Sequence, residues 1–151
     1  MPGRLGTDIA LDLVDSRALS IYRVRQQERR RRSAGRVVRL RDLATLSDRA
    51  NLGQALIVRL LTPTGELAAL GHPGYGSRLH EVVGSPNTPT TRNLAKLFVI
   101  EALKQERRVE TIVSVDVEPH PSDRFRIVVS AAVKPIGQDT VLPLGPLLLE
   151  L

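Results

Sequence analysis

Residues 51–110 have the sequence NLGQALIVRLLTPTGELAALGHPGYGSRLHEVVGSPNTPTTRNLAKLFVIEALKQERRVE, in which two helical apolar patterns flank a glycine-rich turn. Within 51–61 the apolar residues recur at i, i+3, i+4 and i+8, which predicts a helix with one buried face. Pro63 ends this helix, because proline disfavours helical geometry at the residue before it. The glycines between 71 and 76 predict a turn that needs a permissive backbone. Residues 66–70, just before that turn, are expected to be extended.

Two further helices are predicted after the turn. The shorter covers 78–83 and has Ser77 as its candidate cap. The longer runs over 89–105, with Thr88 as its cap and Pro89 at its first position. Its apolar stripe is broad, which predicts burial against more than one neighbour. The apolar residues expected to be buried in the two helices are Leu79, Val82, Val83, Leu94, Leu97, Phe98, Val99, Ala102 and Leu103.

Three strands are predicted in the C-terminal part. Residues 112–118 and 124–134 alternate apolar and polar side chains, as in strands with one buried face. The apolar residues that point to one face are Val113, Val115 and Val117 in the first strand and Phe125, Ile127, Val129, Ala131 and Val133 in the second. Residues 140–151 are apolar, but Pro143 and Pro146 lack backbone donors and so predict an edge strand. The pattern predicts an α+β fold, with a small mixed sheet whose C-terminal antiparallel strands pack against two or three helices.

The N-terminal part is less regular. Residues 7–14 alternate apolar and polar side chains, which predicts a strand with one wet face, and 37–40 are its candidate hairpin partner. The segment between them is too charged and aperiodic to bury, and forms either a helix near 18–30 or a loose connection. We therefore expect a basic N-terminal extension with a strand or hairpin over 1–50 and an α+β domain over 51–151.

The positive charge is concentrated in one segment. The formal net charge is +6, and nine arginines lie between residues 23 and 41, four of them consecutive at 29–32. A solvated connection, contact with an acidic protein partner and binding to nucleic acid all fit such a run. Nucleic acid is the least favoured of the three, since few aromatic side chains are present to stack on bases.

Composition excludes several classes of site. The chain has no cysteine, which excludes disulfides, thiolate catalysis and cysteine-ligated zinc. No apolar run reaches the roughly 20 residues of a membrane span, and the N-terminus lacks the apolar region of a signal peptide. We therefore expect a protein that is cytoplasmic when made and has no membrane partner.

No catalytic constellation is apparent. A hydrolase needs two carboxylates held across a bond, one of them with a raised pKa, whereas the candidate glutamates lie among ordinary helix and turn residues. The histidines form no metal-ligand pattern, and Ser77 lies outside a G-x-S-x-G elbow. The residues considered are Glu66, Glu81, Glu101, Glu106, Glu110, His72, His80 and His120. The sequence predicts no enzyme activity, cofactor or metal.

Two features suit assembly with other proteins. Glu106, Arg107 and Arg108 lie where the long helix meets the next strand, and such charges can hold a partner helix through bidentate hydrogen bonds. The alternative is that the two arginines only complement the dipole at the helix C-terminus. The second feature is the apolar strand over 140–151. Its edge can accept a strand from another chain, or it can be satisfied as the last strand of its own sheet.

The central stretch resembles the sheath-initiator family of contractile-tail baseplates, which occurs in myophage baseplates, type VI secretion systems and extracellular contractile injection systems. The resemblance covers about residues 51–133, and its most specific elements are Leu-Thr-Pro…Gly-Glu and Tyr-Gly-Ser-Arg-Leu. The matching segments are 51–56, 59–67, 70–79, 101–103 and 106–109.

The resemblance implies a small α+β wedge component, of which six copies surround the inner tube beside tube or hub proteins. Their sheet edge templates the first ring of sheath subunits. It further implies that Glu106 and Arg108 stand at the family's Glu-Pro-Arg signature, which docks on the core bundle of the wedge proteins; Arg107 replaces the proline here. The expected wedge-binding residues are Glu106, Arg107 and Arg108. The expected sheath-binding residues are Val141, Leu142, Leu144, Leu147 and Leu149.

The predicted function is therefore a non-enzymatic baseplate component that nucleates the contractile sheath. Some members of the family carry a lysozyme label, so the alternative is a peptidoglycan-degrading tail enzyme. After its synthesis in the cytoplasm, the protein is expected to become part of a phage tail or of a contractile injection particle.

Overall fold

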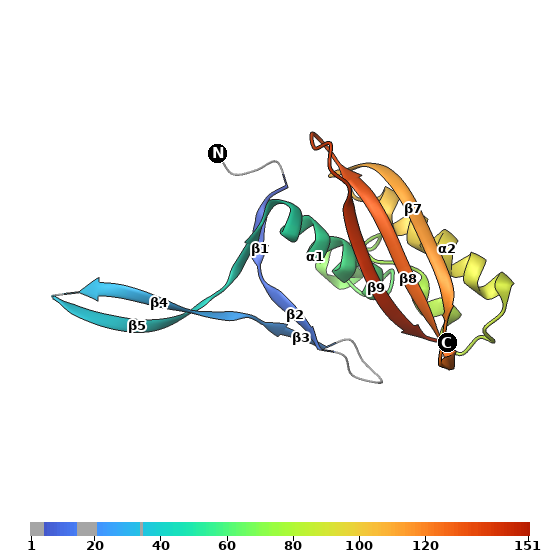
Figure 1. Ribbon diagram of the computed structural model, residues 1–151, viewed down its shortest axis with the longest axis horizontal. Coiled ribbons are helices and arrows are strands. Elements are labelled where there is room, and N and C mark those ends of the chain that lie inside the picture. Colours follow the sequence, from blue (N-terminus) through green and yellow to red (C-terminus); the bar gives the residue numbers. More distant parts are fainter. Residues whose placement is uncertain (1–4, 15–20, 34) are drawn as a thin grey trace. The chain divides into compact units, whose positions relative to one another are not determined.

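The computed structural model describes residues 5–14, 21–33 and 35–151 (Figure 1). The chain forms two compact units, Met1–Gln54 and Ala55–Leu151. Helix α1 (Asp48–Leu61) begins in the first unit and ends in the second.

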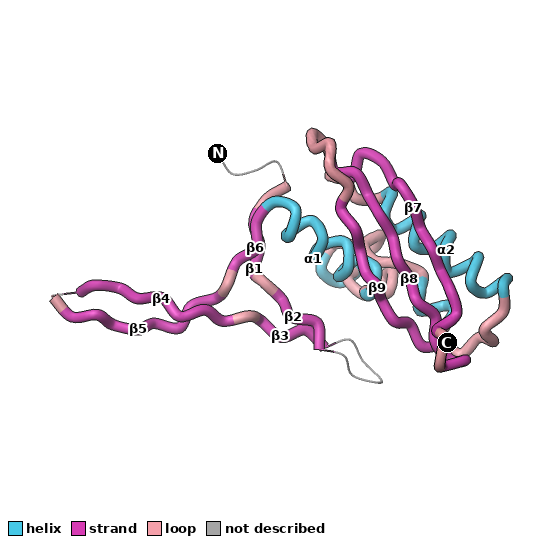
Figure 2. Tube along the Cα trace, viewed as in Figure 1, coloured by secondary structure: helices cyan, strands magenta, loops and turns pink. Residues whose placement is uncertain are grey.

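The first unit consists of three antiparallel two-stranded ladders (Figure 2). They are β1 (Thr7–Ile9) with β6 (Thr45–Ser47), β2 (Leu11–Val14) with β3 (Ile21–Val24), and β4 (Gln26–Ser33) with β5 (Arg36–Leu43). One residue interrupts the chain between successive ladders, namely Ala10, Arg25 and Ala44. These three residues exchange backbone hydrogen bonds in a ring: Ala10 N donates to Ala44 O (2.8 Å), Ala44 N to Arg25 O (2.9 Å) and Arg25 N to Ala10 O (2.9 Å). The three ladders therefore meet at one closed junction.

Side chains of α1 fix this junction. The Gln54 amide donates to Ile9 O (2.8 Å) and accepts from Leu11 N (2.7 Å), so it satisfies the backbone on both sides of the junction residue Ala10. Asn51 is buried and donates to Leu5 O at 2.9 Å. Buried polar groups of this kind need such partners, because an unpaired buried group is costly. The first unit is thus held by backbone and amide hydrogen bonds around a small apolar centre.

Two predictions for the first unit are wrong. The predicted helix near 18–30 is absent from its described part, where β3 and β4 are strands; residues 15–20 lie outside the described residues. Residues 37–40 pair with 29–32, and not with 7–14. Arginine is a good helix former, but pairing with the β-branched pair Val37 and Val38 in β5 outweighs that local preference. Residues 7–14 are extended as predicted, but they form two strands with different partners, β1 and β2. The predicted alternation fails at the junction, where Ile9 is 40% exposed and Ala10, expected on the wet side, is buried.

The second unit confirms the predicted α+β class. Its elements after α1 are the 3₁₀ helices η1 (Ala68–Leu70) and η2 (Leu79–Val82), helix α2 (Pro89–Lys104), and strands β7 (Val109–His120), β8 (Asp123–Pro135) and β9 (Leu142–Glu150). The strands form an antiparallel sheet in the order β7-β8-β9, and α2 lies along one face next to β7 (Figure 1). Thr88 caps α2 as predicted, since its side chain accepts from Thr91 N at 3.2 Å.

The core of this unit follows the alternation of β8. Ile127, Val129, Ala131 and Val133 are buried, as predicted, and α2 contributes Ala95, Phe98, Val99, Ala102 and Leu103. Burial of these side chains supplies the main stabilising free energy, at roughly 25 cal/mol per Å² of apolar surface removed from water. Phe125, at the start of the same stripe, is instead 55% exposed and stacks against Arg124.

Smaller differences have local causes. Val113 is 54% exposed, because a register shift in β7 between Ile112 and Ser114 breaks the predicted alternation. Residues 66–70 form a turn and η1 where an extended piece was predicted. Leu79 and Val82 are buried as predicted, but three of the apolar positions expected in the core are exposed. Those positions are Val83, Leu94 and Leu97.

Candidate functional site

The first candidate site lies where α2 leads into β7. The helix ends at Lys104, and Gln105 N and Glu106 N donate to Ala102 O (3.3 Å) and Leu103 O (3.2 Å). A tight turn follows, closed by Val109 N donating to Glu106 O at 3.1 Å. This turn brings the side chains on its two sides together before β7 begins.

The glycine-rich elbow over 71–78 is tied back onto the end of α1. Ser77 N donates to Thr62 O (2.8 Å), and the Ser77 hydroxyl donates to Leu60 O (2.5 Å). Gly76 has φ +114°, and a Cβ there would overlap Thr62 O and lie 2.9 Å from the carbonyl of Pro63. Glycine is therefore required at this position. Ser77 anchors the elbow. It was predicted to cap the short helix that follows, but the N-cap of η2 is Arg78.

These two connections assemble a cluster of charged and aromatic side chains. Arg108 donates from Nε to Glu106 Oε1 (2.8 Å) and from Nη2 to Oε2 (3.1 Å), a bidentate pair. Arg59, from the last turn of α1, places Nη2 3.7 Å from Glu106 Oε2 and donates to Gln105 Oε1 at 3.3 Å. The Arg59 guanidinium lies 4.4 Å from the centre of the Tyr75 ring, which the elbow supplies. We call these five residues the clasp.

The charged side chains of the clasp are largely withdrawn from solvent and carry an excess positive charge. The side chains of Glu106, Arg59 and Arg108 are 10%, 13% and 28% exposed, and together they hold one carboxylate and two guanidiniums. Burial raises the pKa of Glu106, but the hydrogen bonds and charge of Arg108, with the charge of Arg59, outweigh it and leave the pKa below its ordinary value. Burial raises the pKa of the Tyr75 phenol. Arg59 Nε is buried and makes no hydrogen bond within the described residues.

Two of the three residues predicted to bind the wedge proteins lie in the clasp. Glu106 and Arg108 come together as an ion pair, whereas Arg107 is exposed and lies outside the clasp. Arg59 and Tyr75 were not predicted to join them, although both lie in the segments that carry the family resemblance. Only the folding of the elbow onto α1 brings them within reach, and no local pattern encodes that contact.

The second candidate site is the outer edge of β9. Leu151 N donates to Phe125 O at 2.7 Å, and in an antiparallel pair such hydrogen-bonded positions alternate. Leu149 and Leu147, opposite Ile127 and Val129, therefore turn their backbone groups to β8. Leu148 and Glu150 turn theirs away from it. Within the described residues, no strand pairs with this outer side of β9.

The remainder of this edge is modified by proline. Pro143 lies opposite Ala132, on the outward-facing alternation of the ladder, so its missing N–H is one that would point away from β8. The register shifts around Gly145 and Pro146, which form a bulge. Gly145 has φ +93°, and a Cβ there would lie 2.7 Å from Val129 O. The predicted edge position of this strand is confirmed.

The residues predicted to bind the sheath lie in different environments. Val141 is 43% exposed and precedes β9; Leu144 is 4% exposed and belongs to the core. Leu142, Leu147 and Leu149 are half-buried. Leu144 therefore has its side chain in the core and, because it alternates with the outward-facing Pro143, its backbone turned to β8.

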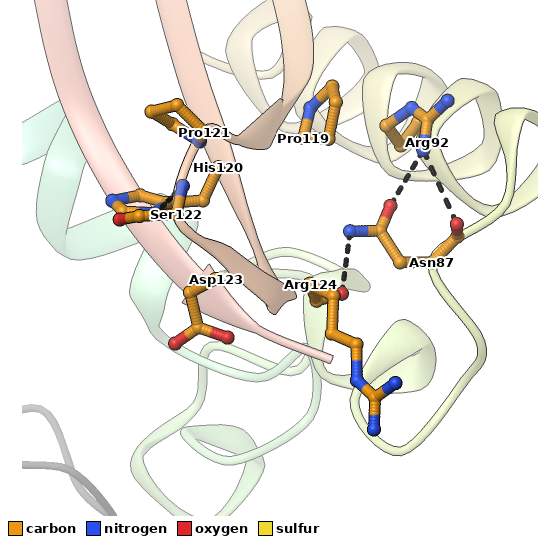
Figure 3. Close-up of a pocket in the computed structure, with 8 residues that line it drawn as sticks. All are labelled: Asn87, Arg92, Pro119, His120, Pro121, Ser122, Asp123 and Arg124. Atoms are coloured by element: carbon orange, nitrogen blue, oxygen red, sulfur yellow. Dashed lines mark hydrogen bonds between the residues drawn. The ribbon is translucent and has the colours of Figure 1, made fainter.

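A surface pocket of about 550 Å³ lies beside the β7–β8 turn (Figure 3). Arg92 donates to the Asn87 side-chain oxygen at 2.7 Å, and the Asn87 amide donates to Arg124 O at 3.0 Å, which ties the start of α2 to the start of β8. The pocket's carboxylate, Asp123, lies 3.3 Å from Arg126. The polar groups of this pocket thus join α2 to β8.

Two of the candidate carboxylates, Glu81 and Glu101, lie beside one arginine. Arg78 donates to Glu81 at 2.7 and 2.9 Å and lies 3.9 Å from Glu101, so a guanidinium stands between these two carboxylates. The hydrogen bond from Arg78 lowers the pKa of Glu81. A general acid needs a shift in the opposite direction. Among the described residues, no group of three His, Asp or Glu is placed to hold a metal ion.

No known family model matches the chain, and no curated protein matches it. Among solved structures, the chain is similar to the crystal structure of a putative tail lysozyme from Geobacter sulfurreducens, with 27% identity and a TM-score of 0.57. The match covers 66% of this chain and 88% of that chain. This likeness suggests a phage tail-related role. In the described part of the chain, no helix is long and apolar enough to cross a bilayer.

Proposed function

We propose that the chain is a structural component of a contractile-tail baseplate, which nucleates the sheath through the edge of β9 and docks on the wedge proteins through the clasp. The observation that carries this proposal is the outward-facing backbone of Leu148 and Glu150 on a strand whose inner side is paired with β8 on both sides of the bulge. The likeness to a tail protein supports it. Strand addition at such an edge supplies backbone hydrogen bonds to a partner.

The prolines of β9 suit a selective edge. Pro143 removes an outward donor, so only part of the edge can pair. A partner strand must therefore match the register of the remaining donors. Copies repeated around a ring add their individually weak contacts through effective concentration.

The clasp offers a positively charged docking group. Arg108 keeps 28% of its side chain exposed while its Glu106 pair fixes its orientation, and Arg107 is exposed beside it. Glu106 would then act by positioning Arg108 rather than by touching the partner. A wedge helix that presents carboxylates is the complementary surface.

The test of the edge uses one substitution and its matched control. Leu148→Pro removes an outward N–H and leaves the hydrogen bonds to β8 in place, whereas Leu148→Ala shortens the same side chain and keeps the N–H. Purified sheath subunits from the same particle are mixed with each variant, and sheath formation is followed by electron microscopy. We expect Leu148→Pro to lose seeding while it stays folded by circular dichroism, and Leu148→Ala to keep it. Normal seeding by the folded proline variant would contradict the proposal.

The alternative is a peptidoglycan-degrading tail enzyme, which the name of the structural neighbour favours. A zymogram of the purified chain on peptidoglycan separates the two functions. We expect no clearing. A cleared band that disappears in Glu81→Gln or Glu101→Gln would replace the structural role with a catalytic one.

A further inference from the structure

The β4–β5 ribbon carries charge that the chain does not neutralise. Between residues 26 and 43 there are seven arginines and two acidic residues, Glu28 and Asp42. Asp42 pairs with Arg29 at 3.3 Å. Arg25 pairs with Asp12, outside the ribbon. Within the described residues, no ion pair is made by Arg30, Arg32, Arg36, Arg39 or Arg41, all of which are exposed.

The register of the ribbon gathers four of these arginines on one face. Arg30 lies directly opposite Arg39, and their neighbours two residues away on the same face are Arg32 and Arg41. Glu28, opposite Arg41, is the one acidic residue on that face, so its formal charge is +3. Like charges directly opposite each other destabilise a strand pair. We call this face the arginine face.

The ribbon also has two open edges and exposed apolar side chains. β4 and β5 pair only with each other among the described strands, and an isolated two-stranded hairpin is marginally stable. Val37, on the arginine face, is 58% exposed, and Leu43 at the ribbon's base is 43% exposed. Arginine combined with exposed apolar residues is typical of protein interfaces. A nucleic-acid partner would not need these exposed apolar side chains.

We infer that the arginine face is the docking surface for an extended, acidic segment of a protein partner. The segment adds along a ribbon edge, and its carboxylates at alternate positions face the arginines, which also repeat every second residue. Each guanidinium can hold a carboxylate through two hydrogen bonds. This surface belongs to the first unit, so the inference stands independently of the proposed roles of β9 and the clasp.

The test measures binding of synthetic peptides to the full chain. One peptide alternates glutamate with valine or threonine over ten residues, and a second has the same composition with its glutamates in one block. The variant Arg30→Gln/Arg39→Gln removes two charges from the arginine face; Arg29→Gln/Arg36→Gln removes two from the opposite face. Both are assayed by fluorescence anisotropy, with a duplex DNA of random sequence as a third probe.

We expect the alternating peptide to bind more tightly than the block peptide, and the arginine-face variant to weaken it about tenfold. The opposite-face variant should weaken it about twofold or less. Equal losses in the two variants, or equal binding of the two peptides, would overturn the inference. So would DNA that binds more tightly than either peptide with a steep salt dependence, since that marks a nucleic-acid surface. Circular dichroism checks that both variants keep their strand content.

Discussion

The β4–β5 ribbon and the β7–β9 sheet are both antiparallel and both offer an open edge, but they differ in what holds their strands together. In β8 every second side chain from Ile127 to Pro135 is buried, whereas every described side chain of β4 and β5 is exposed. The sheet is stabilised by apolar burial, and the ribbon by its backbone ladder with a few exposed side-chain contacts. The edge of the sheet is held by the core beneath it, whereas the described side chains of the ribbon offer no core to hold its edges.

The sheet and the ribbon should differ most in the stability lost when an apolar side chain is shortened. Ile127→Ala in β8 removes a fully buried side chain and should lower the free energy of unfolding by about 3 to 4 kcal/mol. Val37→Ala in β5 should change it by less than about 0.5 kcal/mol, because the side chain is already exposed. Urea denaturation followed by circular dichroism measures both. Similar losses at the two sites would contradict the distinction.

A second pair of substitutions tests the turns. Gly145→Ala places a Cβ against Val129 O in the β9 bulge and should cost about 2 to 3 kcal/mol. Gly35→Ala, in the ribbon turn at φ +78° with open space around it, should cost about 1 kcal/mol from backbone conformation alone. The same denaturation assay applies. A tolerated alanine at Gly145 would mean that the bulge is not constrained by the sheet.

A third pair tests the ion pairs. Glu106→Gln leaves the partly buried Arg59 and Arg108 without their carboxylate and should cost about 2 kcal/mol at neutral pH, less than a fully buried pair because water still reaches Arg108. Asp42→Asn in the ribbon should cost less than about 0.5 kcal/mol, since that pair is exposed.

The pH dependence of the Glu106 effect follows from its lowered pKa. The folded protein holds the carboxylate charged more strongly than the unfolded chain does, so its contribution is complete above its ordinary pKa of 4.5 and is lost as pH falls through the lower folded value. The difference in stability between the parent protein and Glu106→Gln should therefore shrink below about pH 4.5. A constant difference down to pH 2 would show that the clasp acts through packing rather than charge.

The sequence predicted the elements of the second unit where local chemistry and burial agree. Thr88 and Pro89 mark the start of α2, and the alternation from Ile127 to Val133 marks β8. It failed where a contact distant in the sequence decides the structure. The arginines at 29–32 have no surface on which a helix could pack. Pairing with a neighbouring strand holds them in an extended conformation. Arg59 and Tyr75 meet only because Ser77 ties the elbow to α1.

The central claim is that the outer edge of β9 is completed by another subunit. Hydrogen exchange at single amides, measured on the isolated chain and on the chain assembled with sheath subunits, tests it most directly. In the isolated chain, the amides of Leu147 and Leu149 should exchange slowly and those of Leu148 and Glu150 quickly. Assembly should slow Leu148 and Glu150 by about 100-fold or more. Unchanged fast exchange at both positions in seeded, intact sheaths would contradict the account.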